Sequence, residues 1–447
     1  MHMNHSESSA VMQRIRAVLD RESFVERGAG IRPALRFTDG IPGDGAVTGS
    51  GLVNGDLVFL GAQDSSVYGG SVGLSHAAKF RRIYEEAAKV KAPVIEILDS
   101  TGIRLEEAGE VMREMGELIR VKAELRHVVP MVTLIAGNCA GVLAILASMS
   151  DYVVMLEDAS CFVTAPDAVI GQKDAGSSSA RHQAAEGNVD FVGNLTDAAA
   201  YIRSVLTYLP VDNRGLPEFE PAEDPLNRKT EDFFRADART SLRMIADDGV
   251  FLERRIGSER GMVTGLIRIN GQTVGAVVTE EEKLKPEGMQ EAASWIRFCN
   301  DFRIPVLTIA DTTGFSRTQQ EEPLVGRSAA DLAAAYGEAD IPKITVVKRA
   351  CGTAGIIMGS VMLGADLVIG YSESKTELLP DDIAGMIMAE KNTKEAQKQA
   401  AAMFREKQNS LEAAVGRGRI DTIILPEETR QQLAAAFEIY FPKTERK

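Results

Sequence analysis

The pattern of hydrophobic and polar positions predicts the same series of elements twice along the chain. In each half a short helix is followed by two strands, and helices then alternate with buried strands. The expected helices are Val11–Leu19, Ser75–Lys89 and Ala108–Leu125, then Arg239–Ala246, Gly288–Phe302 and Ser328–Ala339. The expected strands are Val47–Val53, Leu57–Gly61, Val94–Leu98, Met131–Ile135 and Tyr152–Leu156, then Met262–Ile269, Thr273–Val278, Val306–Ala310, Ile344–Val347 and Leu367–Gly370. This alternation predicts an α/β fold with largely parallel strand pairing.

Matching motifs indicate that the second half is a copy of the first. An Asn-Gly pair, the strongest short signal of a β-hairpin turn, separates the first two strands of each half at Asn54-Gly55 and Asn270-Gly271. Asp99 ends a buried strand in the first half, and Asp311 does so 212 positions later. A repeat this long indicates a duplicated domain, because solenoid repeats are far shorter.

The segment Pro210–Asn227 marks the expected boundary between the two copies. It contains four prolines and five acidic residues and shows no hydrophobic period. We therefore expect two domains, 1–222 and 223–447. The second half also carries a helix-rich tail, Asn392–Val415, that has no equivalent in the first half.

Composition and charge narrow the class of protein. A formal net charge of −14 argues against a nucleic-acid partner and against binding to an anionic membrane surface. No apolar stretch is long enough to cross a membrane, and no signal-peptide pattern opens the chain, so we expect a cytoplasmic protein. The four cysteines lack the Cys-x-x-Cys spacing of zinc ribbons, and the histidines His76, His127 and His182 lack metal-ligand spacing. No metal is expected.

A glycine-rich turn between a buried strand and a helix occurs once in each half, at Gly137–Val142 and at Cys351–Gly355. Small residues let backbone N–H groups at the start of the helix project into a cavity, where they carry partial positive charge. Such groups stabilise the enolate that forms when a thioester loses an α-proton or a carboxyl group. The alternative is that small residues merely allow the helix and strand to pack closely.

Acidic side chains offer a second, weaker set of candidates. Asp99 and Asp311 follow buried strands, where ligands of open α/β sheets bind, and either carboxylate could act as a general base. Capping of the following turn is the better interpretation for both. The glutamate runs Glu280–Glu282 and Glu321–Glu322 are interpreted as solvated loop charge.

An ordered series of motifs carries a family resemblance. In the first half these are Gln63-Asp64, Val67–Ser71, Asp99–Gly102 with Arg104 and Glu107, Gly137–Gly141, Thr164–Asp167, Tyr208–Pro210 and Asn213-Arg214. In the second half they are Arg297–Cys299, Ile304-Pro305, Asp311 with Gly314-Phe315, Pro342–Thr345, Met358–Ser360 and Gly364–Asp366. In this order they resemble the carboxyltransferase subunit of biotin-dependent acyl-CoA carboxylases and decarboxylases, within the crotonase superfamily. The resemblance covers Met12 to Phe441.

The resemblance implies two tandem crotonase-like (ββα-superhelix) domains related by internal duplication. The first domain would bind an acyl-CoA thioester, and the second would bind biotin carried on a partner protein. Implied partners are a biotin carboxyl carrier protein, a biotin carboxylase or a membrane decarboxylase subunit, and further copies of this chain in a dimer or a trimer of dimers. The active site would lie between the first half of one subunit and the second half of its neighbour.

The family's functional residues map onto the two turns and their surroundings. The catalytic backbone N–H groups implied are those of Gly141 and Val142 for the thioester enolate, and those of Thr353 and Ala354 for the biotin ureido oxygen. The substrate-binding residues implied are Tyr68, Gly69, Gly70, Ser71, Thr101, Gly102, Arg104, Ala140, Gly314, Phe315, Gly352, Gly355 and Ile356.

The chain departs from the family at both turns. Val142 stands where the family has a second glycine, and Cys351, Gly355 and Ile356 replace two aromatic residues and an acid. Besides biotin-dependent carboxyl transfer, two other functions stay open: a biotin-independent decarboxylase of a malonyl-type thioester, and a non-catalytic thioester-binding paralogue. A hydratase or thioesterase is less favoured, because these enzymes use well-placed carboxylates on a single copy of the domain.

Overall fold

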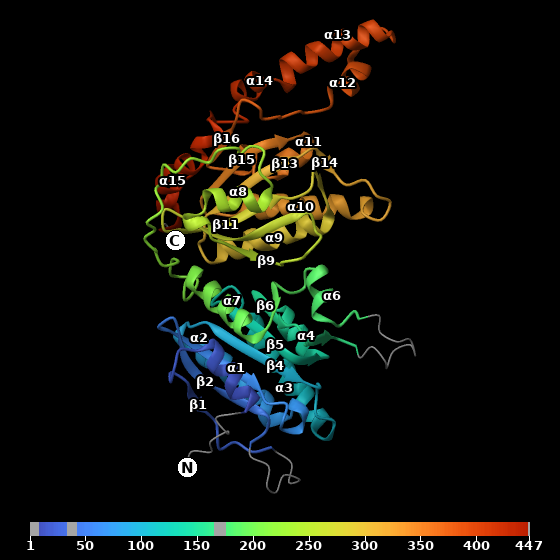
Figure 1. Cartoon of the computed structure of the whole chain (residues 1–447). Coiled ribbons are helices and arrows are strands. Elements are labelled where there is room, and N and C mark those ends of the chain that lie inside the picture. Colours follow the sequence, from blue (N-terminus) through green and yellow to red (C-terminus); the bar gives the residue numbers. More distant parts are fainter. Residues whose placement is uncertain (1–8, 34–42, 165–175, 446–447) are drawn as a thin grey trace. The chain divides into compact units, whose positions relative to one another are not determined.

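The structure is a computed structural model that describes residues 9–33, 43–164 and 176–445. The chain forms two compact units: unit 1 comprises Met1–Pro217 with Arg255–Glu259, and unit 2 comprises Glu218–Arg254 with Arg260–Lys447. Each unit contains one large mixed sheet covered by helices (Figure 1). The predicted α/β class is confirmed.

Unit 1 is built on a sheet with the strand order β1-β2-β3-β4-β5-β6-β8, and β7 pairs with β5 outside this path. The strands β1 to β3 are antiparallel, and those from β3 onward pair in parallel. Its helices are α1 (Ala10–Val18), α2 (Leu74–Val90), α3 (Ala108–Leu125), α4 (Val142–Ser148), α6 (Ala180–Ala185) and α7 (Leu195–Tyr208). Its strands are β1 (Val25–Arg27), β2 (Ala46–Val53), β3 (Asp56–Gln63), β4 (Val94–Ser100), β5 (Met131–Ala140), β6 (Tyr152–Leu156), β7 (Ser160–Phe162) and β8 (Phe191–Gly193).

Unit 2 repeats this plan with the strand order β17-β16-β15-β13-β11-β10-β9, and β12 and β14 form a separate pair. Its helices are α8 (Ala238–Ile245), α9 (Pro286–Asp301), α10 (Glu322–Glu338), α11 (Gly352–Ile357), α12 (Asp381–Met388), α13 (Lys394–Phe404), α14 (Leu411–Gly416) and α15 (Thr429–Tyr440). Its strands are β9 (Phe251–Arg254), β10 (Met262–Ile269), β11 (Gln272–Thr279), β12 (Lys283–Leu284), β13 (Val306–Thr312), β14 (Gly314–Phe315), β15 (Lys343–Ala350), β16 (Leu367–Gly370) and β17 (Thr422–Ile423).

The two Asn-Gly hairpin turns form as predicted. Asn54 and Gly55 have φ values of 53° and 92°, and Asn270 and Gly271 have φ values of 52° and 74°. Two successive positive φ angles are the mark of a type I′ turn, which asparagine and glycine tolerate better than other residues. The turns set the register of β2 with β3 and of β10 with β11, and so fix which side chains of these strands enter each core.

The strands that lead to the two turns are longer than predicted. β5 continues to Ala140 because β7 pairs with its end, with Asn138 opposite Ser160 and Ala140 opposite Phe162. The segment 137–140, predicted as part of a turn, is therefore strand. β15 likewise continues to Ala350, which lies opposite a residue of β13 beyond a local register shift.

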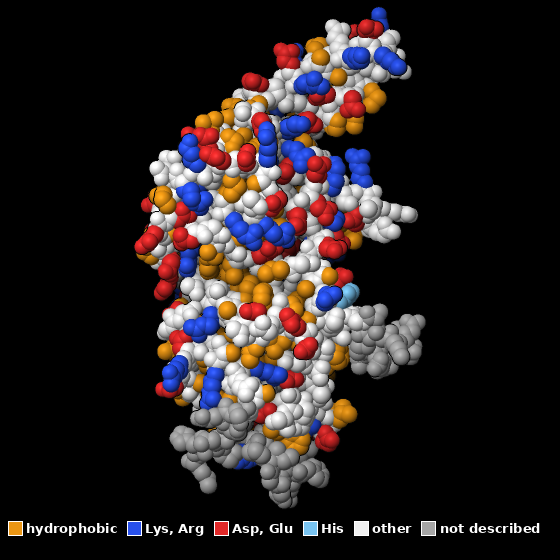
Figure 2. Space-filling view, viewed as in Figure 1, with side chains coloured by type: hydrophobic (Ala, Val, Ile, Leu, Met, Phe, Trp, Pro, Cys, Tyr) orange, Lys and Arg blue, Asp and Glu red, His pale blue; other side chains and the backbone are white. Residues whose placement is uncertain are grey.

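The helices α12, α13 and α14 project from the rest of unit 2 (Figure 1). Hydrophobic side chains lie among charged ones on the visible face of this projection (Figure 2). The most exposed of them belong to α12, namely Met386, Ile387 and Met388. Within the described parts of the chain, no helix combines the length and the apolar character that a membrane crossing needs.

A buried ion pair joins β4 to α3 in unit 1. Lys122 donates to the Glu96 carboxylate over 2.6 Å and to the Ser150 hydroxyl over 2.9 Å, and both charged side chains are almost completely buried. Thr133 of β5 donates a further hydrogen bond to Glu96. Removing one partner of such a pair leaves a buried charge without compensation, which costs far more than the intact pair contributes.

We expect Lys122→Met to lower the local stability of unit 1 by about 3–5 kcal/mol, because Glu96 would stay buried without a cation. The measurement is hydrogen–deuterium exchange of the β4 and β5 peptides. The matched control is Arg120→Met on the same helix, which removes exposed pairs with Glu117 and Glu124 and should leave this exchange unchanged. Equal exchange in both variants would contradict the prediction.

Candidate active site

The segment Tyr68–Ser71 of unit 1 has an unusual backbone. Tyr68, Gly69 and Gly70 have φ values of 52°, 61° and 67°, a run of left-handed conformation that is strained at the tyrosine. A Cβ atom on Gly70 would lie 2.1 Å from the carbonyl oxygen of Asp99, so only glycine fits there. The segment is held against the end of β4, where the Thr101 N–H donates to Gly69 over 3.2 Å.

Arg104 holds this segment in place. Its guanidinium lies 4.5 Å from the centre of the Tyr68 ring and donates to the carbonyl oxygens of Ser71 and Asp44 over 2.9 and 3.2 Å. It also forms an ion pair of 3.0 Å with Glu107. Since the Arg104 side chain is buried and its donors are already engaged, it positions the Tyr68–Ser71 segment rather than presenting a charge to a ligand.

The structure brings the predicted residues of unit 1 together around the end of β5. Val72, next to Ser71, donates to the Gly102 carbonyl over 2.8 Å. A Cβ atom on Gly102 would lie 3.8 Å from the Cβ of Ala140, the last residue of β5. Gly102 and the Tyr68–Ser71 segment therefore lie beside the start of α4.

In the first turn, one of the two amides predicted to bind an oxyanion is already hydrogen-bonded to another strand. Gly141, with φ 63°, precedes α4, but its N–H donates to the Phe162 carbonyl of β7 over 2.9 Å and is not free to bind an oxyanion while this bond is made. Val142 is the first residue of the helix, so its N–H has no acceptor within the helix. The Gly141 N–H is engaged because the hydrogen bonding between β5 and β7 continues for one residue beyond the end of β5.

The Asp99 carboxylate holds the strand that leads into this turn by several hydrogen bonds. It accepts from Arg14 of α1 and from Ser65, each over 2.7 Å, and from the Asn138 N–H over 3.3 Å. A Cβ atom on Gly137 would lie 2.1 Å from a carboxylate oxygen of Asp99, so a side chain at position 137 is excluded. Asp99 thus ties α1, β4 and β5 together, a longer-range role than the predicted turn cap.

The buried side chain of His76 is linked to the backbone of Asp99 through the side chain of Gln63. The Gln63 side chain accepts from the Asp99 N–H over 3.0 Å, and its amide nitrogen lies 3.2 Å from the Nε2 atom of His76. Burial lowers the pKa of His76 to about 4; Asp44 opposes this shift, and Lys79 and Arg104 add to it. His76 is therefore neutral near pH 7.

In the second turn both predicted amides, those of Thr353 and Ala354, lie at the start of a helix. Thr353 and Ala354 occupy the first turn of α11, where N–H groups have no intrahelical acceptor, and Thr353 is exposed. The Gly352 N–H donates to the Glu377 carbonyl over 2.7 Å. Gly355 lets α11 approach the strand closely, because a Cβ atom there would lie 2.5 Å from the Ala350 carbonyl carbon.

The remaining predicted residues of unit 2 lie beside this turn. β14, formed by Gly314 and Phe315, contacts α11. Ile356 of α11 is exposed. The structure thus brings together within unit 2 all of its predicted site residues.

In unit 2 an ion pair with Asp311 holds the strand that leads into the second turn, where unit 1 uses the hydrogen bonds of Asp99. Arg349 of β15 pairs with Asp311 and also, over 2.6 Å, with Glu282. The pKa of Arg349 is raised by these pairs, chiefly by its hydrogen bond to Asp311. Asp311 is thus engaged structurally, as Asp99 is. The preceding residue, Lys348, donates to Ala236 over 2.6 Å, and burial lowers its pKa to about 8.

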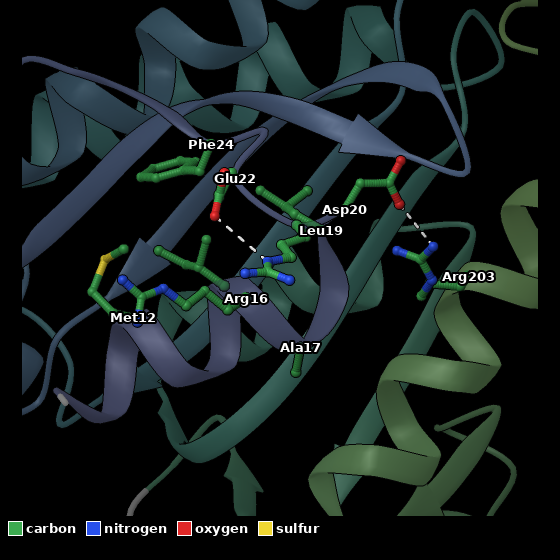
Figure 3. A pocket seen from close by; sticks show the side chains of 10 residues that line it. Met12, Arg16, Ala17, Leu19, Asp20, Glu22, Phe24 and Arg203 are labelled. Carbon is green, nitrogen blue, oxygen red and sulfur yellow. Dashed lines mark hydrogen bonds and ion pairs between the residues drawn. The ribbon is translucent and has the colours of Figure 1, made fainter. Parts of the chain in front are cut away.

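Other features of the described chain do not form the candidate site. A cavity of about 710 Å³ beside α1 contains none of the predicted residues, and its Asp20 and Arg203 form an ion pair of 2.7 Å (Figure 3). Over residues 9–33, 43–164 and 176–445, no group of three or more acidic, histidine or cysteine residues could hold a metal ion. Of the predicted motif Thr164–Asp167, residues 165–167 lie outside the described residues.

Comparison with known proteins places the chain in a family. The family model described as "Carboxyl transferase domain" matches residues 4–447. The chain is 31% identical to the methylmalonyl-CoA carboxyltransferase 12S subunit of Propionibacterium freudenreichii, over 96% of this chain and 88% of that protein. It is also 31% identical to the propionyl-CoA carboxylase beta chain of Cereibacter sphaeroides, over 95% of this chain and 89% of that protein.

A solved structure shares the fold. The transcarboxylase 12S crystal structure, whose hexamer assembly and bound methylmalonyl-coenzyme A are described for that protein, superposes with a TM-score of 0.92 at 30% identity, covering 97% of this chain and 90% of that one. The predicted pair of crotonase-like domains is confirmed by this likeness.

We expect the buried His76 to make the protein less stable as the pH falls from about 6.5 to about 4. In this window the unfolded chain takes up a proton that the folded protein does not, and the resulting loss is about 3 kcal/mol. The variant His76→Gln keeps a hydrogen-bonding side chain but does not titrate, so it should lose about 3 kcal/mol less over this range.

The measurement is urea unfolding at a series of pH values. The control is His182→Gln at an exposed position, which should follow the wild type. Parallel curves for the wild type and His76→Gln would show that His76 is not responsible.

Proposed function

The chain belongs to the carboxyl transferase family, and from this we propose that it transfers a carboxyl group between biotin and the α-carbon of a small acyl-CoA. The predicted family and enzyme class, an acyl-CoA carboxyltransferase, are confirmed by the full-length match and the named relatives. Their names contain propionyl or methylmalonyl groups, which supports a short acyl group as the substrate of this chain.

The first domain, 1–222, is proposed to bind the acyl-CoA. A cavity of about 490 Å³ beside α4 and β7 supports this assignment, because its walls are mostly apolar and include Ile135, Ile145 and Val189. The enolate oxygen would accept from the Val142 N–H. The Gly141 N–H would join it only after leaving the Phe162 carbonyl, so closure of this oxyanion hole involves a small shift of β7.

The second domain, 223–447, is proposed to bind biotin. The first turn of α11, in which Thr353 is exposed and Ala354 is buried, suits the ureido oxygen, since the Thr353 and Ala354 N–H groups lie at the positive end of a helix. Bound carboxybiotin supplies carbon dioxide and the base that takes the α-proton. The chain itself would position both substrates and stabilise developing negative charge, which agrees with the structural engagement of Asp99 and Asp311.

Several partners follow from this proposal. The biotin would arrive on a carrier protein, loaded by a biotin carboxylase or discharged through a membrane decarboxylase subunit. The active site would form between unit 1 of one protomer and unit 2 of another, in a dimer or a trimer of dimers. The hexamer described for transcarboxylase 12S supports an oligomer of this kind.

The observation that carries the proposal is the presence of both strand–turn–helix junctions, 212 positions apart, in a chain that matches the family throughout its length. A single junction would fit close packing alone. Two junctions fit a reaction in which two oxygen atoms, one on the thioester and one on biotin, acquire negative charge.

We expect Val142→Pro to lower kcat for carboxyl transfer from a carboxylated biotin carrier to propionyl-CoA by about 100-fold or more, because it removes an oxyanion donor. Proline is well tolerated at the first position of a helix, so the fold should persist. The control Val142→Ala keeps the N–H and should stay within a few-fold of the wild type.

Co-expression tests whether the site is shared between subunits. Thr353→Pro should inactivate unit 2 in the same way, and a mixture of the two inactive variants in one oligomer should regain activity, because one of the two sites in a mixed dimer is then intact. No recovery in mixed oligomers would overturn the shared site. Carbon dioxide release from methylmalonyl-CoA that persists with avidin would instead indicate the biotin-independent decarboxylase.

A further inference from the structure

A second, smaller cavity lies inside unit 2, between α11 and the strands β13, β15 and β16. Its volume is about 80 Å³. Most of its walls are apolar, with a few polar side chains among them. It is lined by Ala310, Thr345, Val347, Ala350, Gly352, Gly355, Ile356, Met358, Ser360, Met362, Val368, Thr376, Leu378 and Arg419.

Three polar atoms in this lining are buried and have no hydrogen-bond partner among the residues that the structure describes. They are the hydroxyl oxygens of Ser360 and Thr376 and the Nε atom of Arg419. Thr376 as a whole is 5% exposed. A buried polar group without a partner costs about 1–3 kcal/mol, and native proteins contain few of them. Three in one small cavity indicate that the cavity is built to receive a ligand.

No carboxylate in the described parts of the chain forms an ion pair with Arg419. The guanidinium donates to two backbone carbonyl oxygens, those of Thr376 over 2.9 Å and Gln408 over 2.7 Å. Burial lowers the pKa of Arg419, and the nearby Arg417 lowers it further. Arg419 as a whole is half-buried, but its Nε atom is buried, and a buried donor of a charged group normally has a partner, so an anion is the expected partner of the Nε donor.

The duplicated half provides an internal comparison. The cavity beside α4 uses equivalent positions, since Ile135 and Ser148 precede Val347 and Ser360 by 212 residues. There, however, the Ser148 hydroxyl donates to a backbone carbonyl over 2.8 Å, and none of the described residues in the lining is charged. The polar side chains Gln183 and Asn188 in that lining are also hydrogen-bonded.

The unpaired donors are therefore a property of the second cavity and not of the repeated fold. Arg419 lies two residues before Asp421, which bonds to Val368 of β16 as Asp190 bonds to Val153 of β6, so the counterpart of Arg419 in unit 1 is Asn188. An arginine thus lines the second cavity at the position where a neutral asparagine lines the first.

We propose that this cavity binds a small aliphatic monocarboxylate of two or three carbons, such as acetate or propionate. The carboxylate would accept from the Arg419 Nε–H and from the hydroxyls of Ser360 and Thr376. The alkyl group would lie against apolar residues such as Val347 and Val368. The volume suits this size, since a cavity of about 150 Å³ holds benzene and one of about 80 Å³ holds fewer heavy atoms.

The proposed ligand would touch the second turn. Gly352, Gly355 and Ile356 of α11 form part of the cavity wall, so occupancy would fix the helix whose first turn carries the exposed Thr353 amide. The proposal goes beyond carboxyl transfer and concerns a free acid, not a thioester or biotin. It stands or falls independently of the proposed function, because its test measures binding alone.

The test is calorimetric titration of the full-length protein with sodium propionate. We expect saturable binding, weakened about tenfold in Thr376→Val, because the valine has the same shape but lacks the hydroxyl. Since this hydroxyl has no partner in the free protein, Thr376→Val should not lower the unfolding temperature. Arg419→Gln should abolish binding.

The matched control is Ser148→Ala in unit 1, the counterpart of Ser360, which should leave propionate binding unchanged. Sodium bicarbonate serves as a second titrant with the same oxygen chemistry and no alkyl group, and it should bind more weakly. Absence of binding at tens of millimolar propionate, equal affinity in Thr376→Val and the wild type, or tighter binding of bicarbonate than of propionate would overturn the proposal.

Discussion

Each candidate turn depends on an aspartate that fixes the end of a neighbouring strand. Asp99 and Asp311 occupy equivalent places, and each carboxylate holds the strand that leads into the glycine-rich turn. A backbone amide can stabilise an oxyanion only if it is aimed in advance, because reorientation during the reaction would consume the gain. In the proposed reaction the two aspartates would therefore act by fixing this geometry, and neither would need to act as a base.

The two units hold these aspartates with different arginines. In unit 1 the cation comes from α1 as Arg14, and Gly137 leaves room for the Asp99 carboxylate. In unit 2 the position equivalent to Gly137 is Arg349, which supplies the cation from the strand itself. The substitution of an arginine for a glycine within a repeat is thus explained: one half brings its cation from a distant helix, and the other carries it in place.

The sequence was sufficient to predict the elements that depend on local pattern. The Asn-Gly turns, the helix Ala108–Leu125 and the strands Tyr152–Leu156 and Leu367–Gly370 lie where their hydrophobic periods and turn residues put them. The missed features depend on contacts between distant segments. β7 is only three residues long and gives no periodic signal, yet its pairing extends β5 and engages the Gly141 amide. The hydrogen bonds of Asp99 with Arg14 and of Arg419 with Gln408 likewise have no local signature.

The two turns differ in ways that agree with the two different ligands of the proposed reaction. In unit 1 the Gly141 amide is engaged by a strand carbonyl, and the cavity beside α4 is larger and mostly apolar, which agrees with the proposed acyl group. In the second turn Thr353 is exposed, and the cavity behind it is small and is lined by the half-buried Arg419. A gene duplication begins with two identical sites, so every difference between them has been acquired since. The hairpins and the sheet order stay the same in the two units, whereas the turns and the cavities behind them differ, which agrees with the separate chemical roles proposed for the two sites.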